Sequence, residues 1–119
     1  MKDRVLLGLA FLLAASLSLS AQESVGRGVG TATCAEIAKL RLALSGSDRT
    51  FTSWARGFMT GWNFAAQSLG KRARNLNATA VENQETFIAQ HCDRNPQHRY
   101  LQAVMALYVS LPELSRQKK

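Results

Sequence analysis

Residues 51–69 read FTSWARGFMTGWNFAAQSL, and this stretch decides the fold. Its large apolar residues recur every three to four positions, which is the spacing of one face of an α-helix. The face comprises Phe51, Trp54, Ala55, Phe58, Trp62, Ala65, Ala66 and Leu69. Polar residues, among them Arg56 and Asn63, fall on the opposite side. We therefore predict a long amphipathic helix whose aromatic face the rest of the chain covers.

Gly57 and Gly61 lie one turn apart on the same side of this predicted helix. Each glycine in a helix interior costs about 1 kcal/mol relative to alanine. A second backbone that packs closely against this side would explain why two such residues are present. The pair therefore predicts a close approach of a neighbouring segment.

A capping box begins the helix that precedes this stretch. The Thr33 hydroxyl can accept a hydrogen bond from the amide of Glu36, and the Glu36 carboxylate can accept one from the amide of Thr33. The helix is predicted over residues 34–44. Its predicted inward side comprises Ile37, Leu40 and Leu44.

Two more helices are predicted after the central stretch. Asn77 is a favoured N-cap residue and predicts a helix over residues 78–92. Asn95-Pro96 predicts the start of a further helix, because proline at the first helical position loses no hydrogen bond. This helix is predicted over residues 96–111. Its inward residues are Leu101, Val104, Leu107, Tyr108 and Leu111. Since no segment of useful length alternates apolar and polar residues, we predict an all-α fold with four helices.

The two ends of the chain are predicted to lie outside this helical domain. Residues 1–21 have a charged start, an apolar run and small residues at the end, which is the pattern of a secretory signal peptide. Residues 22–32 contain three glycines and are predicted to be a flexible leader. The helical domain covers residues 33–112, and residues 113–119 form a charged tail. A cleaved signal peptide predicts export to a bacterial periplasm, with no stable membrane insertion afterwards.

The chain has two cysteines, Cys34 and Cys92. In an oxidising compartment two cysteines allow one intramolecular disulfide, which here would tie the start of the first helix to the end of the third. The loop of about 59 residues would stabilise the fold by roughly 4 kcal/mol in the chain-entropy model. We therefore predict a small domain cross-linked by a Cys34–Cys92 disulfide.

The chain is basic, with 15 Lys and Arg against 8 Asp and Glu and a formal net charge of +7. Without Lys2, Arg4 and Asp3 of the signal peptide the balance is 13 to 7, a net charge of +6. The anionic neighbours of an exported protein are lipid headgroups, cell-wall polymers and acidic proteins, so nucleic acid is not expected as a partner. Solubility alone is the alternative explanation of the charge.

Six residues are candidates for contact with a partner protein: Arg56, Trp62, Asn63, Lys71, Arg72 and Arg74. Trp62 lies toward the edge of the apolar face, and burial in the core is its alternative role. The three basic residues after the central helix would form an anion-binding loop or would only complement the helix dipole. Arg56 and Asn63 share one side of the helix, and their alternative roles are an ion pair for Arg56 and a backbone hydrogen bond for Asn63.

No catalytic, metal or cofactor site is predicted. Four residues are of metal-ligand types: Cys34, His91, Cys92 and His98. Oxidised cysteines do not bind metals, and adjacent residues on a helix point about 100° apart. Glu82 and Glu85 would act as a carboxylate pair only in a deep cleft, and such a pair is more typical of an exposed helix face. We therefore predict that the protein is not an enzyme; an activity on cell-wall sugars is the distant alternative.

Several short motifs resemble those of a known group of proteins. They are Thr33-Cys34 at a helix start, Trp54-x-x-Gly57-Phe58-x-x-Gly61-x-Asn63 in the central helix, and His91-Cys92-x-x-Asn95-Pro96 before a helix that contains Ala103. This pattern covers about residues 33–111 and resembles small exported bacterial proteins grouped with the acid-stress chaperone HdeA. The resemblance implies a helical periplasmic fold with one disulfide and a role in binding or protecting other proteins. The better-known members loosen or dissociate in acid and expose apolar surface.

This chain differs from that group in charge, because acid would take its net charge from +6 toward +15 with both histidines protonated. A second resemblance, through a Cys, Gly-Phe-x-x-Gly and Cys pattern, is to Rap1a/Tai-type immunity proteins. Members of that family bind and block toxins injected by rival bacteria. Here the second cysteine, Cys92, closes a predicted third helix and comes shortly before Asn95-Pro96, which is a departure from their pattern. Both resemblances imply a protein partner, and neither specifies an oligomeric state.

Overall fold

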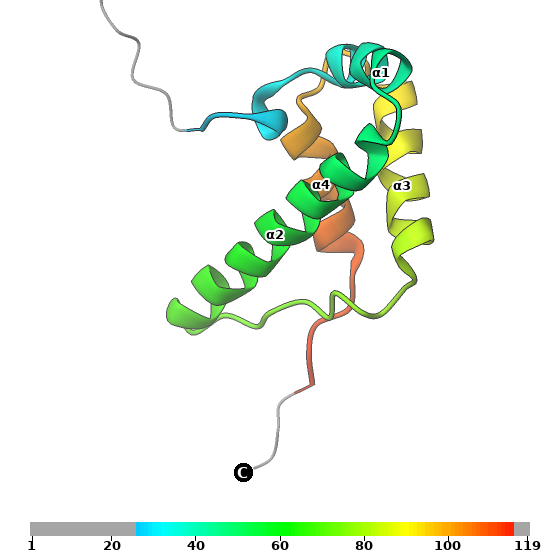
Figure 1. Cartoon of the computed structure of the whole chain (residues 1–119). Coiled ribbons are helices and arrows are strands. Elements are labelled where there is room, and N and C mark those ends of the chain that lie inside the picture. The colour runs from blue at the N-terminus through cyan, green and yellow to red at the C-terminus, as the bar shows by residue number, and fades with distance from the viewer. Residues whose placement is uncertain (1–25, 116–119) are drawn as a thin grey trace, which may run out of the picture.

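The computed structural model describes residues 26–115 as a helical domain (Figure 1). A 3₁₀ turn, η1 (Val29–Thr31), precedes four α-helices: α1 (Cys34–Ala43), α2 (Ser47–Ser68), α3 (Val81–Arg94) and α4 (Tyr100–Ser110). The prediction of an all-α fold with four helices is therefore confirmed. The predicted signal peptide, the start of the leader and the end of the tail lie outside the described residues. In the part of the chain that the structure describes, no helix combines the length and the apolar character that a membrane crossing needs.

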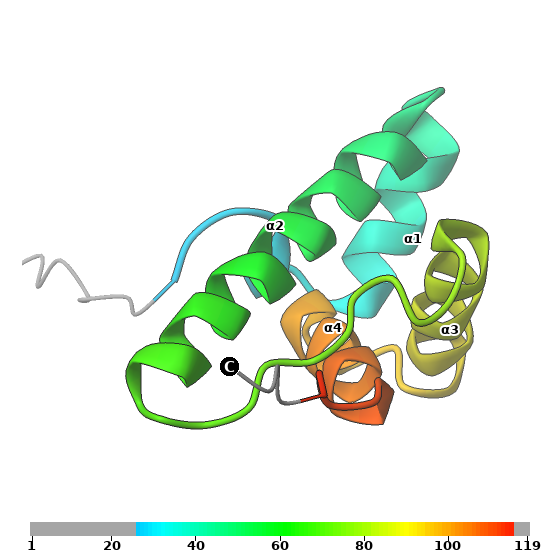
Figure 2. The same cartoon turned by 90° about the horizontal axis from the view of Figure 1, so that it is seen from below.

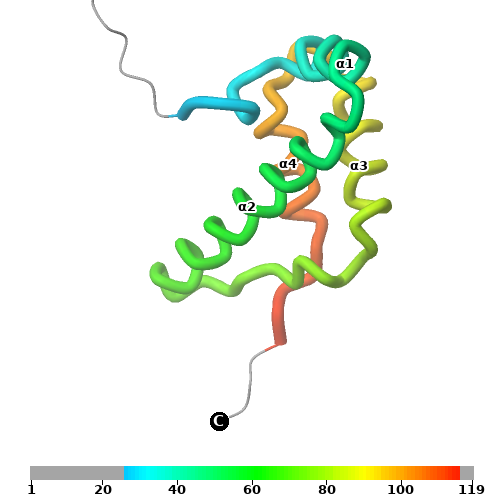
Figure 3. The backbone as a smooth tube through the Cα atoms, in the orientation of Figure 1, coloured from blue at the N-terminus to red at the C-terminus, as the bar shows by residue number. Residues whose placement is uncertain are grey.

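Helix α4 lies at the centre of the fold. It packs against α3, α2 and η1, whereas α1 contacts α2 and α3. Figures 1 and 2 show α4 between α2 and α3. From the far end of α2 the segment 69–80 crosses to the start of α3, a path that the tube in Figure 3 follows. This segment is tied to the chain after α4, because the Asn75 amide donates to the Pro112 carbonyl (2.8 Å).

The hydrophobic core lies mainly between α4 and the first half of α2. Helices α1 and α3 each contribute one isoleucine, Ile37 and Ile88, to this core. Its buried residues include Ile37, Phe51, Ala55, Met59, Ile88, Tyr100, Ala103, Val104, Leu107, Tyr108 and Leu111. The sequence predicted that the rest of the chain covers the aromatic face of residues 51–69. The helix at the centre of the fold is instead α4.

The buried stripe of α2 differs from the predicted aromatic face. Met59, which the predicted face omitted, is fully buried, whereas Leu69 is 71% exposed. Trp54 and Phe58 are only partly buried, and Trp62 is 46% exposed. The reason is length, since α4 has 11 residues and can cover only part of a helix of 22. The C-terminal half of α2 therefore keeps large apolar side chains at the surface.

Of the three residues predicted on the inward side of α1, Ile37 alone is buried. Leu40 is 40% exposed and Leu44 is 55% exposed. Leu44 has extended backbone angles and lies just beyond the last helical residue, so it no longer shares the helix face. The prediction for Leu40 and Leu44 was therefore wrong.

Helix α3 begins later than the sequence predicted. Its N-cap is Ala80 and not Asn77. The buried Gln84 side chain donates hydrogen bonds to the carbonyls of Leu76 (2.8 Å) and Thr79 (3.1 Å). These bonds hold the residues before Ala80 in turns, so the helix cannot extend back to residue 78.

Helix α4 also begins later, at Tyr100 and not at Pro96. The carbonyls of Pro96 and His98 accept hydrogen bonds from the amides of Ala35 (3.0 Å) and Cys34 (2.7 Å). The first amides of a helix have no partner within it. The loop before α4 therefore remains non-helical because it supplies the partners that the start of α1 needs.

The start of α1 otherwise forms as predicted. The Glu36 carboxylate accepts from the Thr33 amide (2.7 Å), and the Thr33 hydroxyl accepts from the Glu36 amide (3.2 Å). The adjacent Cys34 is bonded to Cys92, with an S–S distance of 2.11 Å. The predicted disulfide is therefore confirmed, and it joins the first residue of α1 to the last turn of α3.

The described part of the predicted leader packs onto the domain. The Tyr100 amide donates to the Ala32 carbonyl (2.8 Å), and the Arg99 guanidinium donates to the Thr31 carbonyl. Gly30 is buried, and its α-carbon lies so close to the Trp54 ring that a Cβ would overlap it. The close approach predicted at Gly57 and Gly61 is wrong, because a Cβ at either position would meet nothing within 4 Å. The tight contact at Gly30, with the side chain of Trp54, was not predicted.

Alanine substitutions at these glycines should have opposite effects. Gly57→Ala and Gly61→Ala should each raise the free energy of unfolding by about 0.5–1 kcal/mol, because both sites are open and helical. Gly30→Ala should lower it by about 1–3 kcal/mol, because Trp54 must move. Urea denaturation measures all three. A destabilising Gly57→Ala would show that a segment does pack against that side of α2.

Candidate functional site

One groove combines an exposed tryptophan with basic side chains. It has a volume of about 510 Å³ and lies between the C-terminal half of α2, the loop after it and the end of α4. We call it the α2–α4 groove. Its lining residues are Trp62, Ala66, Gly70, Lys71, Arg72, Arg74, Met105, Tyr108, Val109 and Glu113. Four of the six predicted partner-contact residues therefore share this one surface.

Asn63 holds the wall of the groove in place. Its Oδ1 accepts hydrogen bonds from the Arg74 amide (2.8 Å) and from the Tyr108 hydroxyl (2.7 Å). Its Nδ2 donates to the Arg74 carbonyl (2.9 Å). One side chain thus connects α2, the loop and α4. Of the two roles considered for Asn63, the structure shows the backbone hydrogen bond, and this bond positions the groove.

Trp62, which lines the groove, is the last member of an aromatic row on α2. Trp54 and Phe58 are stacked with ring centroids 5.4 Å apart, and Phe58 and Trp62 are stacked at 6.0 Å. The Tyr108 ring meets Trp62 edge-on at 6.5 Å. Tyr108 is buried and its hydroxyl is hydrogen-bonded to Asn63. The indole of Trp62 therefore packs between Phe58 and Tyr108 while part of its surface faces solvent.

Basic side chains exceed acidic ones along the groove. Arg72 Nη1 lies 3.0 Å from Glu113 Oε2, and Glu113 is the single carboxylate among the lining residues. Arg74 Nη1 donates to the Leu111 carbonyl (2.9 Å), so that its guanidinium is partly engaged in the fold. Lys71 is exposed beside them. The groove therefore has a surplus of positive charge next to an exposed indole.

A second, smaller pocket lies on the other side of Asn63. Its volume is about 240 Å³, and its lining residues are Thr60, Asn63, Phe64, Gln67, Ala73 and Leu114. Phe64 is 70% exposed and Leu114 is 42% exposed. Apolar surface therefore continues past the groove along the end of α2.

Arg56 is the one candidate contact residue that the structure separates from the others. It is exposed on α2 and lines none of the pockets described here. Within residues 26–115 it has no ion pair either. Conversely, Tyr108, Val109 and Glu113 belong to the groove, although the sequence placed them in a core helix or in the tail. Only the crossing of α4 with the end of α2 brings them beside Trp62.

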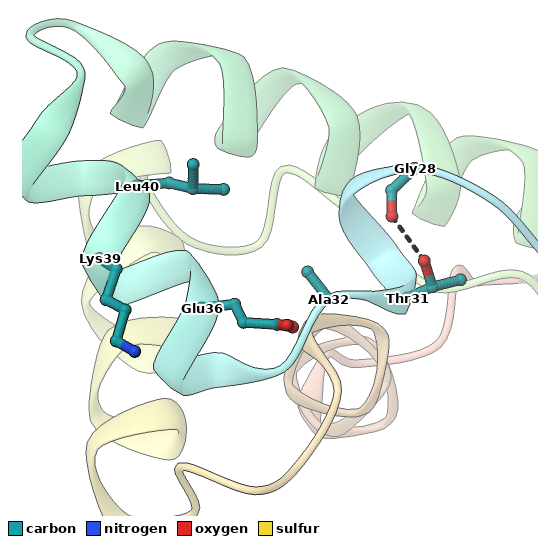
Figure 4. A pocket seen from close by; sticks show the side chains of 6 residues that line it. All are labelled: Gly28, Thr31, Ala32, Glu36, Lys39 and Leu40. Atoms are coloured by element: carbon teal, nitrogen blue, oxygen red, sulfur yellow. Dashed lines mark hydrogen bonds between the residues drawn. The ribbon is translucent and has the colours of Figure 1, made fainter.

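In two further pockets several of the polar groups are hydrogen-bonded or paired within the fold. The larger, about 590 Å³, is a shallow depression beside α1 lined by Gly28, Thr31, Ala32, Glu36, Lys39 and Leu40 (Figure 4). Its Glu36 carboxylate belongs to the capping box, and the Thr31 hydroxyl donates to the Gly28 carbonyl (2.8 Å). In the other, Arg41 pairs with Asp48 (3.0 Å) and Thr52 donates to Glu85 (2.7 Å).

Three titratable groups have clearly shifted pKa values. Hydrogen bonds from Thr33 lower the pKa of Glu36, and burial raises the pKa of Tyr100 to about 12. Burial, then the nearby charges of His98 and Arg94, lowers the pKa of His91. None of the three lines the α2–α4 groove.

No protein-family model, curated protein or solved structure matches this chain. The resemblances to the HdeA-like group and to the Rap1a/Tai-type proteins therefore stay predictions.

Proposed function

We propose that this protein is a non-catalytic binding protein of the periplasm that holds other proteins in the α2–α4 groove. The observation that carries the proposal is Trp62, an indole that is 46% exposed and packs between two aromatic rings. Tryptophan and arginine are the residues that most often dominate the energy of protein interfaces. Here Arg72 lines the same groove as Trp62.

The charge of the groove specifies the partner's chemistry. Lys71, Arg72 and Arg74 face one carboxylate, Glu113, which is already paired. A partner segment with an acidic residue beside an apolar side chain would satisfy both the cations and the indole. The confirmed disulfide agrees with export to an oxidising compartment, which is where the predicted signal peptide would send the chain.

Two kinds of protein binding are compatible with this site. The HdeA-like role is protection of many proteins under stress, and the large apolar residues exposed on α2 support it. The Rap1a/Tai-type role is neutralisation of one toxin, and the groove supports it because hydrogen bonds of Asn63 to Arg74 and Tyr108 already hold its wall in place. A preformed site binds one partner with little loss of entropy.

Affinity capture at two pH values tests the proposal. The oxidised chain without its signal peptide would be immobilised and exposed to periplasmic extract at pH 7 and at pH 3. We expect Trp62→Ala and Lys71→Glu to abolish most capture, and Arg56→Ala, on the same helix but outside the groove, to retain it.

The identity of the captured proteins separates the two roles. One stoichiometric partner at pH 7 would support the immunity role, and many partners at pH 3 alone would support the chaperone role. Capture that is equal in all three variants, or no capture at either pH, would contradict a binding function of the groove.

A further inference from the structure

The two histidines of the chain face each other at the end of α3. His91 lies in the last turn of α3 and His98 in the loop before α4. His91 Nε2 is 3.1 Å from His98 Nδ1, and the ring centroids are 5.3 Å apart with an angle of 42° between the planes. Both side chains are partly exposed, so the nitrogen pair lies within reach of solvent.

The backbone beneath this pair is fixed from several sides. The Asn95 side chain donates to the His91 carbonyl (2.8 Å), and the His98 amide donates to the Asn95 carbonyl (3.0 Å). The His98 carbonyl accepts from the Cys34 amide (2.7 Å). Cys34 is in turn bonded to Cys92, the residue after His91. The disulfide and this turn therefore hold the two rings at a set separation.

We propose that His91 and His98 form a two-histidine chelate for a divalent transition metal, with Cu²⁺ and Zn²⁺ as the ions it would take. Zinc–nitrogen bonds are about 2.0–2.1 Å, so two imidazole nitrogens on a tetrahedral ion lie about 3.3–3.4 Å apart. The observed 3.1 Å is close to this separation, and each ring would turn so that its lone pair points at the ion instead of at the other ring. The ion replaces the hydrogen bond between the rings and leaves further coordination positions open to water or another ligand.

Metal binding requires a lone pair on each facing nitrogen. His91 Nε2 and His98 Nδ1 would then be the ligand atoms, and the ring protons would sit on His91 Nδ1 and His98 Nε2. Arg94 lies three residues after His91 in the last turn of α3, and its charge opposes a bound cation, so Arg94→Gln should tighten metal binding.

Isothermal titration with ZnCl₂ and with CuCl₂ tests the chelate on the oxidised chain without its signal peptide. We expect one ion per chain, with Cu²⁺ bound more tightly than Zn²⁺, as the Irving–Williams order of affinities for divalent metals predicts. His91→Gln and His98→Gln should each weaken binding by at least about tenfold, since even loss of a supporting residue costs that much. The double variant should show no one-to-one binding.

Two further measurements keep the test independent of folding defects in the variants. In the wild-type chain, Cu²⁺ should broaden the ring proton resonances of both histidines, which are the only two present. Saturating Zn²⁺ should raise the Tm by several degrees, because the ion binds the folded chain. Unchanged affinity in the double variant, or sharp histidine resonances at excess Cu²⁺, would overturn the proposal.

Discussion

Replacement of both cysteines with serine should lower the free energy of unfolding by about 4 kcal/mol, which is the largest stability change that we expect in this chain. The bond joins residues 58 positions apart, so its loss restores much conformational freedom to the unfolded chain. It also holds the start of α1 to the end of α3, two elements at the edge of the core. A domain of this size has a small core, and such a loss removes much of its stability.

Guanidinium denaturation of the wild type, the reduced wild type and the Cys34→Ser/Cys92→Ser variant measures the effect. The reduced protein and the variant should have the same midpoint, since both lack the cross-link. A loss below about 1 kcal/mol in both would show that the unfolded chain is already compact and that the loop-entropy account does not apply.

Asn63→Ala should destabilise the chain by about 2–4 kcal/mol, because three hydrogen bonds of about 0.5–1.5 kcal/mol each depend on this side chain. The variant leaves the Arg74 backbone and the Tyr108 hydroxyl without their partner. Without its bond to Asn63 the Tyr108 side chain can turn away from α2, so Trp62 should lose the edge contact with Tyr108. The groove should open at the same time as stability falls.

Denaturation and tryptophan fluorescence together measure this change. Gln67→Ala is the control, because Gln67 is exposed one turn further along α2 and such surface changes stay within about 0.5 kcal/mol. An Asn63→Ala variant as stable as the Gln67→Ala control would contradict the role that we give to Asn63.

The sequence predicted the helices well because their determinants are local. The Thr33–Glu36 capping box needs only residues three positions apart, and it forms where predicted. The start of α4 was missed because it depends on a distant element. Pro96 and His98 supply acceptors for the first turn of α1, a demand that no local pattern reveals.

The groove was partly predictable for a similar reason. Trp62 and the basic loop stand out in the sequence, since one is at the edge of an apolar face and the other follows a helix end. Their proximity to Tyr108 and Glu113 depends on how α4 crosses α2. The histidine pair shows the same limit, because His91 was compared with its neighbour Cys92 and not with His98 across the turn.

The affinity of a purified partner for groove variants tests the central claim most directly. With the partner from capture, isothermal titration would compare the wild type, Trp62→Ala and Arg56→Ala. If Trp62 anchors the interface, Trp62→Ala should weaken the Kd at least about 30-fold, equivalent to about 2 kcal/mol, while Arg56→Ala stays within about twofold. An unchanged Kd for Trp62→Ala, or an equal loss for Arg56→Ala, would show that the partner binds elsewhere.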